Sequence, residues 1–361
     1  MNSSSVSEST SAASVSPTWD AILEPRSRGT LERVLPAYVV KRRWYRTKTE
    51  RVQSARIIAA FPLAYGGGEN ARIALVELTL ESGGRDTYVL PLAYVSGEAA
   101  AAVHAARPDA QILPLHVTDA ERRTSAGFVV DALALEGVLK ALLEKLAKGG
   151  EIEDAGMLLR FHPLADAFAD ENVGAIQGRL LDAEQTNSSI LFGDRFVGKV
   201  VRKLDSGESP DLEISRFLTA AGYTHAPPLA GSVDVIPAGE TTIPPSTVAV
   251  FARFVPNRGD AWTHCLQELS NWLGEIEQMG DSTPPKLPPN DILTRALFPL
   301  PDDIVVAVGP YPRAAALLGS RVGEMHKLLS RTHIEAFVPE PLGGEARQAS
   351  RRRSCKISRV R

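Results

Sequence analysis

Apolar and polar residues alternate along several short stretches in the first part of the chain. Residues 55–60, 71–80 and 87–92 show this period of two, which is typical of strands with one buried face. The region 19–130 is therefore predicted to form a β-rich unit. The glycine run at 66–68 is predicted to be a hairpin loop rather than a phosphate-binding loop, because no Gly-Lys-Ser/Thr follows it.

A spacing of three to four residues between apolar positions marks the predicted helices. It runs over 131–149, after a capping aspartate and before a glycine, and it returns over 261–279 and near 313–330. A proline-rich stretch at 283–289 separates the last two helices. Residues 247–255 are apolar and end before a proline, so they are predicted to form a strand.

Between these helices lies a predicted hairpin. Residues 177–182 are expected to form a strand, 183–188 a polar loop and 189–192 a returning strand. Gly193-Asp194 then supplies a two-residue turn into a third strand at 195–201.

One lysine in the third strand stands out by its neighbours. With a period of two, Lys199 shares a face of the strand with Val197 and Val201. A lysine between two valines suits a point charge that binds nucleotide phosphates. The alternative is an edge lysine whose ammonium group reaches water along its aliphatic stem.

A helix is predicted to follow this strand, with Ser209 as its N-cap and Pro210 as its first residue. Glu213 then lies in the first turn. It is either the carboxylate that holds Lys199, as in protein kinases, or a helical ion-pair partner of Arg216 three residues on. The sequence leaves both interpretations open.

Composition and charge narrow the class of protein. The chain has 361 residues, 44% of them hydrophobic, and a net charge of −3, which does not favour nucleic acid as a partner. The two cysteines, Cys265 and Cys355, form neither a disulfide framework nor a metal site, and no apolar run reaches the roughly 20 residues of a membrane span. We expect a cytoplasmic protein without a membrane partner. Residues 1–18, rich in serine, are expected to be a disordered tail.

Four motifs stand in order along the chain: Glu184-Gln-Thr-Asn-Ser-Ser189, Gly198-Lys-Val-Val-Arg202, Pro210-Asp-Leu-Glu-Ile-Ser-Arg-Phe-Leu218 and Val255-Pro-Asn-Arg-Gly-Asp-Ala-Trp262. Arg42-Arg-Trp-Tyr45 with Lys48 precedes them. Together these segments resemble the bacterial maltokinases, which make maltose 1-phosphate and are often fused to trehalose synthase. The resemblance covers most of residues 30–341.

This resemblance implies an α+β fold of the protein-kinase-like type seen in aminoglycoside phosphotransferases and maltokinases, with an N-terminal β-rich cap. The implied reaction is ATP plus maltose to ADP plus maltose 1-phosphate, with Mg²⁺ as the metal, in α-glucan and glycogen synthesis from trehalose. The implied partners are ATP, maltose or a similar α-glucan disaccharide, and trehalose synthase.

The resemblance also assigns binding residues. Lys199 and Glu213 take the phosphate-clamp roles, Thr186, Asn187 and Ser188 lie over the phosphates, and the backbone from Ala252 to Phe254 offers hinge hydrogen bonds to adenine. Asp260 is placed to reach the ribose. From the residues alone it is equally suited to cap the helix that begins at 261, and the two roles are compatible.

Two motifs of such a kinase are absent from the sequence. None of the 7 histidines begins a His-Gly-Asp segment and no Asp-Phe pair exists, so neither a catalytic base nor metal ligands can be assigned. His326 is expected to be an ordinary helix histidine. We expect a C-terminally truncated chain, close to inactive alone, whose basic residues 342–361 are non-native rather than a site for nucleic acid or anionic lipid.

The expected domains are a tail at 1–18, the cap at 19–130, an intermediate region with the kinase N-lobe at 131–255, the start of the C-lobe at 256–341, and the basic tail. Two other functions remain open at this point. One is a nucleotide-binding pseudokinase, and the other is a regulatory or interaction module that docks on trehalose synthase.

Overall fold

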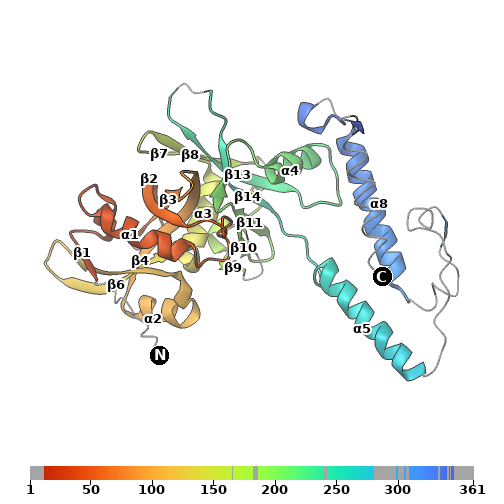
Figure 1. Cartoon of the computed structure of the whole chain (residues 1–361), viewed down its shortest axis with the longest axis horizontal. Coiled ribbons are helices and arrows are strands. Elements are labelled where there is room, and N and C mark those ends of the chain that lie inside the picture. The colour runs from red at the N-terminus through yellow and green to blue at the C-terminus, as the bar shows by residue number, and fades with distance from the viewer. Residues whose placement is uncertain are drawn as a thin grey trace. The chain divides into compact units, whose positions relative to one another are not determined.

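The computed structural model describes residues 12–164, 166–181, 186–239, 242–279, 298–299, 305, 309–331, 334–339, 341 and 343–344. The chain divides into two compact units, Met1–Pro256 and Asn257–Arg361. Among the described residues, the first unit contains two β-sheets with four α-helices, and the second contains helices (Figure 1).

The first sheet is built almost entirely from the N-terminal part of the chain. Its strands are antiparallel except for one parallel pair, which joins β1 to β5. Their order across the sheet is β1 (Ala13–Val15), β5 (Gln111–Thr118), β6 (Thr124–Asp131), β4 (Arg85–Ser96), β3 (Asn70–Leu80) and β2 (Val52–Ala64), with β12 (Lys203–Leu204) paired to β4.

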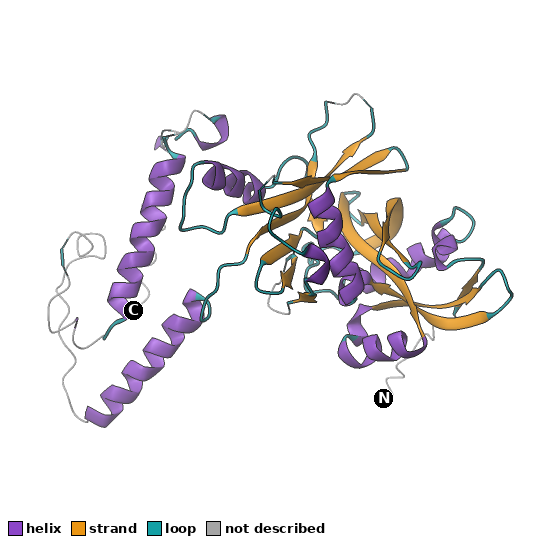
Figure 2. Ribbon diagram, turned by 180° about the vertical axis from the view of Figure 1, so that it is seen from behind, coloured by secondary structure: helices purple, strands orange, loops and turns teal. Residues whose placement is uncertain are grey.

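The second sheet is antiparallel throughout and carries the predicted hairpin. Figure 2 shows the strands of the first unit in orange and the helices in purple. The order of the second sheet is β7 (Gly150–Asp154), β8 (Met157–Pro163), β13 (Leu229–Pro237), β14 (Ser246–Arg253), β11 (Phe196–Val200), β10 (Ser188–Phe192) and β9 (Gly178–Leu180). Strands β11 and β14 are thus interior strands with a neighbour on each side.

The helices of the first unit are α1 (Arg28–Val39), α2 (Gly97–Ala106), α3 (Glu136–Lys148) and α4 (Pro210–Ala220). Short 3₁₀ segments occur at Trp19–Leu23, Pro108–Ala110, Ala132–Ala134 and Val173–Ala175. The second unit contains α5 (Ala261–Met279), α8 (Tyr311–Leu329) and a 3₁₀ turn at Glu335–Phe337. None of the helices in the described ranges is both long and apolar enough to cross a bilayer.

Both faces of the first sheet are buried, and they belong to different cores. On β3, Ala74, Val76 and Leu78 face α1 in one core. Ile73 and Leu75 face the other, which also contains α3 and the second sheet. Helix α3 packs against strands of both sheets. Because side chains alternate along a strand, one strand can serve two cores.

Most of the elements predicted from periodicity are present. Strands β2, β3 and β4 contain the three predicted stretches, and the glycines at 66–68 form the β2–β3 hairpin loop with positive φ at each. Helix α3 ends at Gly149, whose φ is +70°, as the pattern predicts. Asp131 caps the preceding 3₁₀ turn by accepting from the Leu133 N–H. The predicted helix over 261–279 is confirmed with the same bounds.

Two helices in the first unit were not predicted. Helix α1 contains Pro36, which pattern analysis treats as a helix breaker, and α2 is mostly alanine without an apolar stripe. The tail prediction is also wrong for residues 12–18, because Ala13–Val15 forms β1 against β5 and Val15 is buried. Residues 1–11, 182–185, 283–289, 345–361 and most of 300–308 lie outside the described residues.

Candidate functional site

Lys199 lies in the middle of the second sheet. It pairs with Ser189 on β10 and with Val250 on β14. Strand β11 is therefore not an edge strand, and the edge-lysine interpretation is wrong. The Lys199 side chain is 31% exposed.

The predicted sidedness of β11 is confirmed. Phe196 and Val200 are buried in the core between the sheets, whereas Val197 and Lys199 are half-buried on the opposite face. Gly198 is needed on the core face, because a Cβ there would lie 2.7 Å from the ring of Phe251. The apolar face thus fixes the strand, and Lys199 projects from its other side.

Helix α4 supplies the carboxylate that Lys199 contacts. Ser209 caps the helix, its hydroxyl accepting from the Leu212 N–H at 3.3 Å, and Pro210 follows as predicted. The Lys199 Nζ donates to Oδ2 of Asp211 at 2.6 Å. This carboxylate is two residues before Glu213.

Glu213 has neither of the two partners considered from the sequence. In the part of the chain that the structure describes, no ion pair joins it to Lys199, and Arg216 instead donates to Glu208 at 2.9 Å. The helical-pair interpretation of Glu213 with Arg216 is therefore wrong. Residues 211 and 213 point about 200° apart around the helix, so both cannot face Lys199 equally well.

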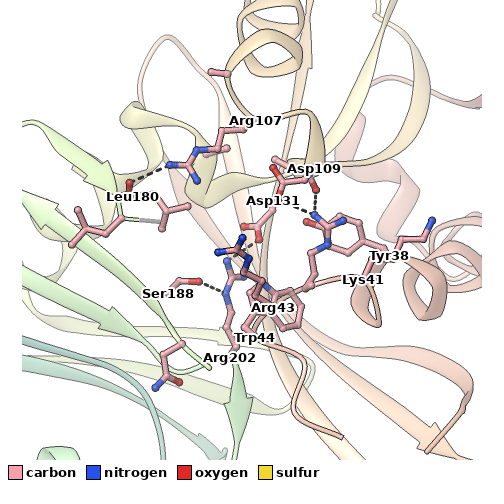
Figure 3. Close-up of a pocket in the computed structure, with 16 residues that line it drawn as sticks. Tyr38, Lys41, Arg43, Trp44, Arg107, Asp109, Asp131, Leu180, Ser188 and Arg202 are labelled. Atoms are coloured by element: carbon pink, nitrogen blue, oxygen red, sulfur yellow. Dashed lines mark hydrogen bonds and ion pairs between the residues drawn. The ribbon is translucent and has the colours of Figure 1, made fainter. Parts of the chain in front are cut away.

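The predicted phosphate loop is described from Thr186 onward, and 183–185 lie outside the described residues. Thr186 is exposed and Asn187 half-buried. Ser188 is buried on the core face of β10, and its Oγ accepts from the Nε–H of Arg202 at 2.7 Å (Figure 3). The side chain of Ser188 therefore lies on the face of the hairpin opposite to Lys199.

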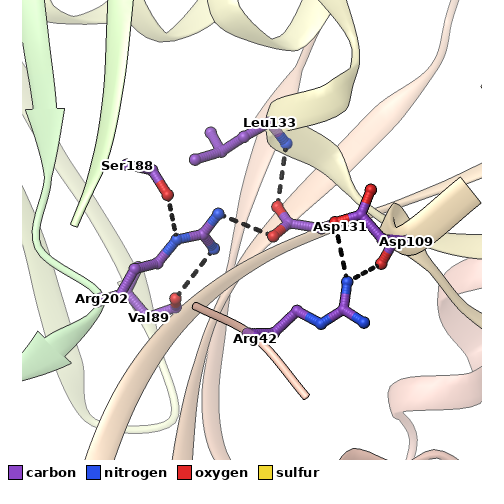
Figure 4. A network of polar contacts seen from close by, with 7 residues as sticks. All are labelled: Arg42, Val89, Asp109, Asp131, Leu133, Ser188 and Arg202. Carbon is purple, nitrogen blue, oxygen red and sulfur yellow. Dashed lines mark hydrogen bonds and ion pairs between the residues drawn. The ribbon is translucent and has the colours of Figure 1, made fainter. Parts of the chain in front are cut away.

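Arg202 joins this hairpin to the first sheet. It is 1% exposed and donates to Oδ2 of Asp131 at 2.8 Å (Figure 4). Its guanidinium lies 5.0 Å from the ring of Trp44 (Figure 3). The backbone continues the link, because the Val89 N–H donates to the Arg202 carbonyl at 2.7 Å. Arg202 therefore has a structural role, because it connects the hairpin to the first sheet.

The predicted hinge segment is held by hydrogen bonds at the end of β14. The Phe254 N–H donates to the Arg195 carbonyl at 2.9 Å and the Arg253 N–H to the Pro228 carbonyl at 2.8 Å. Ala252 is paired with both neighbouring strands. The N–H groups of 253 and 254 are thus used within the protein, and the carbonyl groups are the better candidates for ligand contacts.

A buried glutamate reinforces the same segment. Glu171, whose side chain is 6% exposed, accepts from the side chains of Arg195 and Arg253. The hydrogen bond from Arg195 is the largest cause that holds the pKa of Glu171 below its usual range, and the Arg253 bond adds to it against the opposing effect of burial.

Asp260 lies in the second unit and caps α5. Its Oδ1 accepts from the Thr263 N–H at 2.6 Å, and this backbone hydrogen bond is the main reason that the pKa of Asp260 is lowered. The N-cap prediction is confirmed. The ribose role of Asp260 stays a prediction.

The described residues do not form a metal site. They contain no group of three or more His, Cys, Asp or Glu side chains that could hold an ion. Asp211 and Glu213 supply two carboxylates, and these diverge around α4. The Mg²⁺ implied by the resemblance therefore has no ligand set in this part of the chain, and no chemistry is assigned to it.

Sequence analysis missed two neighbours of Lys199. Asp211 stood in the quoted helix motif but was not considered as the lysine's partner, because kinase analogy favours the glutamate. Ser189 was assigned only to its strand, although the register places it directly across from Lys199. The predicted two-residue turn at Gly193-Asp194 would have paired Lys199 with Ser188. The turn in the structure includes Arg195 as well, since Phe192 pairs with Phe196, and this shift of one residue places Ser189 across from Lys199.

Most of the first sheet lies in a segment that matches a known protein family. Residues 38–134 match the family model described as the maltokinase N-terminal cap domain. This part of the chain is maltokinase-like. The matched cap runs from the end of α1 through β2 to β6 and the following 3₁₀ turn, and it includes Trp44 and Asp131, both of which contact Arg202.

Solved structures of glucosamine kinase also match. One, in complex with glucosamine, ADP and inorganic phosphate, is 16% identical with a TM-score of 0.42, and the match covers 88% of this chain and 53% of that chain. A second, crystal form A, is 17% identical with a TM-score of 0.41 over the same shares. The chain thus spans about half of the length of these proteins.

Proposed function

We propose that this chain is part of an ATP-dependent sugar kinase of the maltokinase type, and that its first unit binds the nucleotide phosphates through Lys199. The observation that carries the proposal is the ion pair between Lys199, on an interior strand, and a first-turn carboxylate of α4. An interior lysine held by the next helix is the arrangement that protein kinases use to position α- and β-phosphates.

The charges around Lys199 suit this role. The Lys199–Asp211 pair is partly open to solvent, with side chains 31% and 57% exposed, so the lysine can exchange its carboxylate for a phosphate at little cost. Thr186 and Asn187 immediately precede β10, and Ser189 on β10 is paired with Lys199. These groups offer hydroxyl and amide hydrogen bonds to phosphate oxygens.

The remaining site residues extend the proposal beyond the phosphates. The carbonyls near Ala252 and Phe254 are proposed to receive the adenine amino group, because β14 lies next to β11. Asp260 is proposed to bind the ribose. The match to the maltokinase cap supports maltose as the proposed acceptor and trehalose synthase as the proposed partner, in α-glucan synthesis from trehalose.

Nucleotide binding is tested by titrating the full chain with a fluorescent ATP analogue. Lys199→Ala is expected to weaken binding by about tenfold or more, because a charge-assisted contact to phosphate is lost. Lys140→Ala, which removes an exposed lysine on α3, is the matched control and should bind as the parent chain does. Equal binding by the parent and Lys199→Ala would contradict the proposal.

Phosphate transfer is tested separately by measuring ADP release with maltose and, as a second acceptor, glucosamine. ADP release that depends on maltose supports maltose as the acceptor. ADP release with glucosamine but not with maltose would identify glucosamine as the acceptor instead. Nucleotide binding without ADP release from either sugar is the result expected of this chain alone, since no catalytic base or metal ligands can be assigned in it, and it would make nucleotide binding the function of the chain by itself.

A further inference from the structure

A hollow lies on the face of the hairpin that is opposite to Lys199. Its volume is about 700 Å³, within the usual range for small-molecule sites. It opens between the cap and the second sheet, and residues from both line it (Figure 3). The cap contributes Arg42, Arg43 and Trp44, and the hairpin contributes Asn187 and Ser188.

The lining is strongly basic. Five cationic side chains meet two carboxylates, and the seven are Lys41, Arg42, Arg43, Arg107, Arg202, Asp109 and Asp131. Each carboxylate is already bonded to an arginine of the wall, Asp109 to Arg42 at 3.0 Å and Asp131 to Arg202 at 2.8 Å. Among the described residues of the wall, neither carboxylate is therefore left to balance the charge of Lys41 or Arg43.

Two of the cations have no carboxylate to contact. Lys41 and Arg43 are exposed, and neither makes an ion pair with any residue in the described ranges. Arg42 adds an unused donor, because its Nε–H is buried without a hydrogen-bond acceptor although its guanidinium lies over Tyr38 at 4.5 Å. A buried donor without a partner costs free energy, so an anion that accepts from it is favoured.

We propose that this hollow binds a small molecule that carries a phosphate group. Clustered arginine and lysine donors recognise the several oxygens and the double negative charge of phosphate. Trp44 and Tyr38 form apolar surface in the same wall, which suits the organic part of a phosphate ester. The size of the hollow favours a small ligand over an extended polyanion.

A ligand in this hollow would contact the face of the hairpin that is opposite to Lys199. Ser188 and Asn187 line the hollow, and Ser188 is bonded to Arg202 there, while the next residue, Ser189, faces Lys199 on the other side. Binding in the hollow is therefore positioned to alter the same strand that carries the proposed nucleotide contacts. The binding site itself does not depend on the proposed kinase activity.

The test is calorimetric titration of the full chain, at constant ionic strength, with three probes: sodium phosphate, maltose 1-phosphate and ADP. The variant is Lys41→Ala with Arg43→Ala, and it is expected to bind the active probe about tenfold or more weakly. The control is Lys48→Ala with Arg51→Ala, which removes the same charge from exposed residues outside the hollow. A third protein, Lys199→Ala, separates this site from the nucleotide site.

The proposal is supported if the Lys41→Ala, Arg43→Ala variant loses affinity for the probe while the control variant and Lys199→Ala keep it. The probe that binds then distinguishes free phosphate from a sugar or nucleotide ester. The proposal is overturned if no probe binds saturably, if both charge variants lose affinity equally, or if only Lys199→Ala loses it. Because Lys41 and Arg43 are exposed, unchanged thermal melting is expected and confirms that each variant is folded.

Discussion

Arg202 shows at the scale of one residue how the cap is attached. Its charge is 1% exposed and is compensated by Asp131, by the Ser188 hydroxyl and by the face of the Trp44 ring. A buried ion pair contributes little net stability by itself, but the loss of one partner leaves an unpaired charge in an apolar site. The free energy of unfolding should therefore be sensitive to single substitutions here.

Arg202→Met is expected to lower the free energy of unfolding by about 3–5 kcal/mol, because Asp131 is left buried without its partner. The measurement is urea denaturation. Arg85→Met, at a side chain that is 67% exposed, is the control and should change stability by less than about 0.5 kcal/mol. The double variant with Asp131→Leu should recover part of the loss, and a double variant less stable than Arg202→Met would contradict this explanation.

Glu171 makes a prediction about pH. Its pKa is lowered in the folded protein, so the unfolded chain takes up the proton first as pH falls. The stabilisation is therefore fully present above the unfolded pKa of about 4.3 and is lost as pH decreases through the folded pKa. Thermal melting between pH 7 and pH 3 should show a smaller acid-induced decrease for Glu171→Gln than for the parent chain.

The control for this prediction is Glu121→Gln, which alters a carboxylate whose side chain is 67% exposed. It should leave the pH dependence of melting almost unchanged. A Glu171→Gln profile parallel to that of the parent would show that the contacts with Arg195 and Arg253 do not distinguish the charged carboxylate from the neutral one.

At the scale of elements, β11 depends on a glycine that no local propensity requires. Gly198 lies on the core face of the strand, and a Cβ there would approach Phe251 to 2.7 Å and Phe192 to 3.0 Å. The two rings lie 6.0 Å apart, centroid to centroid, in the core below the hairpin. The glycine therefore lets β11 pack closely on these rings.

Gly198→Ala is expected to destabilise the chain by about 1–3 kcal/mol through overpacking of this core. It should also weaken binding of the ATP analogue, because the shift moves the strand that carries Lys199. Gly29→Ala is the matched control, since an added Cβ in α1 meets nothing within 4 Å and should stabilise by up to about 1 kcal/mol. The free energy of unfolding of both variants is measured by urea denaturation. Equal values for Gly198→Ala and Gly29→Ala would refute the packing argument.

Some helices and strands of the first unit were predicted from the sequence, and others were missed. Strands β2, β3 and β4 were found because alternation is a property of neighbouring residues. Helix α2 was missed because its alanines carry no apolar stripe, and α1 because Pro36 lies inside it. Strand β1 was missed because only three residues pair there, and their partners lie in β5, about one hundred residues away along the chain.

At the scale of the whole molecule, the two units differ in their cores. The cores of the first unit consist of residues up to Phe251 and require nothing from the second unit. In the second unit, large apolar side chains are exposed on α5 and α8, among them Trp262, Leu266, Leu269, Leu273, Leu317 and Leu318. Exposed apolar faces of this size favour association.

A fragment of residues 1–256 is expected to fold without the remainder of the chain. Its thermal unfolding should be cooperative, because both cores are complete within it. It should also be less prone to aggregate than the full chain when the two are compared by light scattering, since the faces of α5 and α8 are removed. A fragment that melts without a cooperative transition would show that the first unit depends on residues after 256.

The sequence by itself determined the features that rest on near neighbours. The face of β11 that carries Lys199, the cap of α4 by Ser209 and the cap of α5 by Asp260 all follow from spacings of a few residues. The similarity of residues 38–134 to a maltokinase cap was indicated by the one quoted segment inside that range, Arg42-Arg-Trp-Tyr45 with Lys48. Such features are local, and periodicity and capping chemistry report them directly.

Only the tertiary structure decided which distant groups meet. Arg202 reaches Asp131 across 71 positions and the Val89 carbonyl across 113, and Arg253 reaches Glu171 across 82. Lys199 contacts Asp211 rather than Glu213 because of the way α4 packs on β13 and β14, the strands beyond β11. A partner at such a separation depends on how sheets and helices pack, and periodicity along the chain carries no record of that packing.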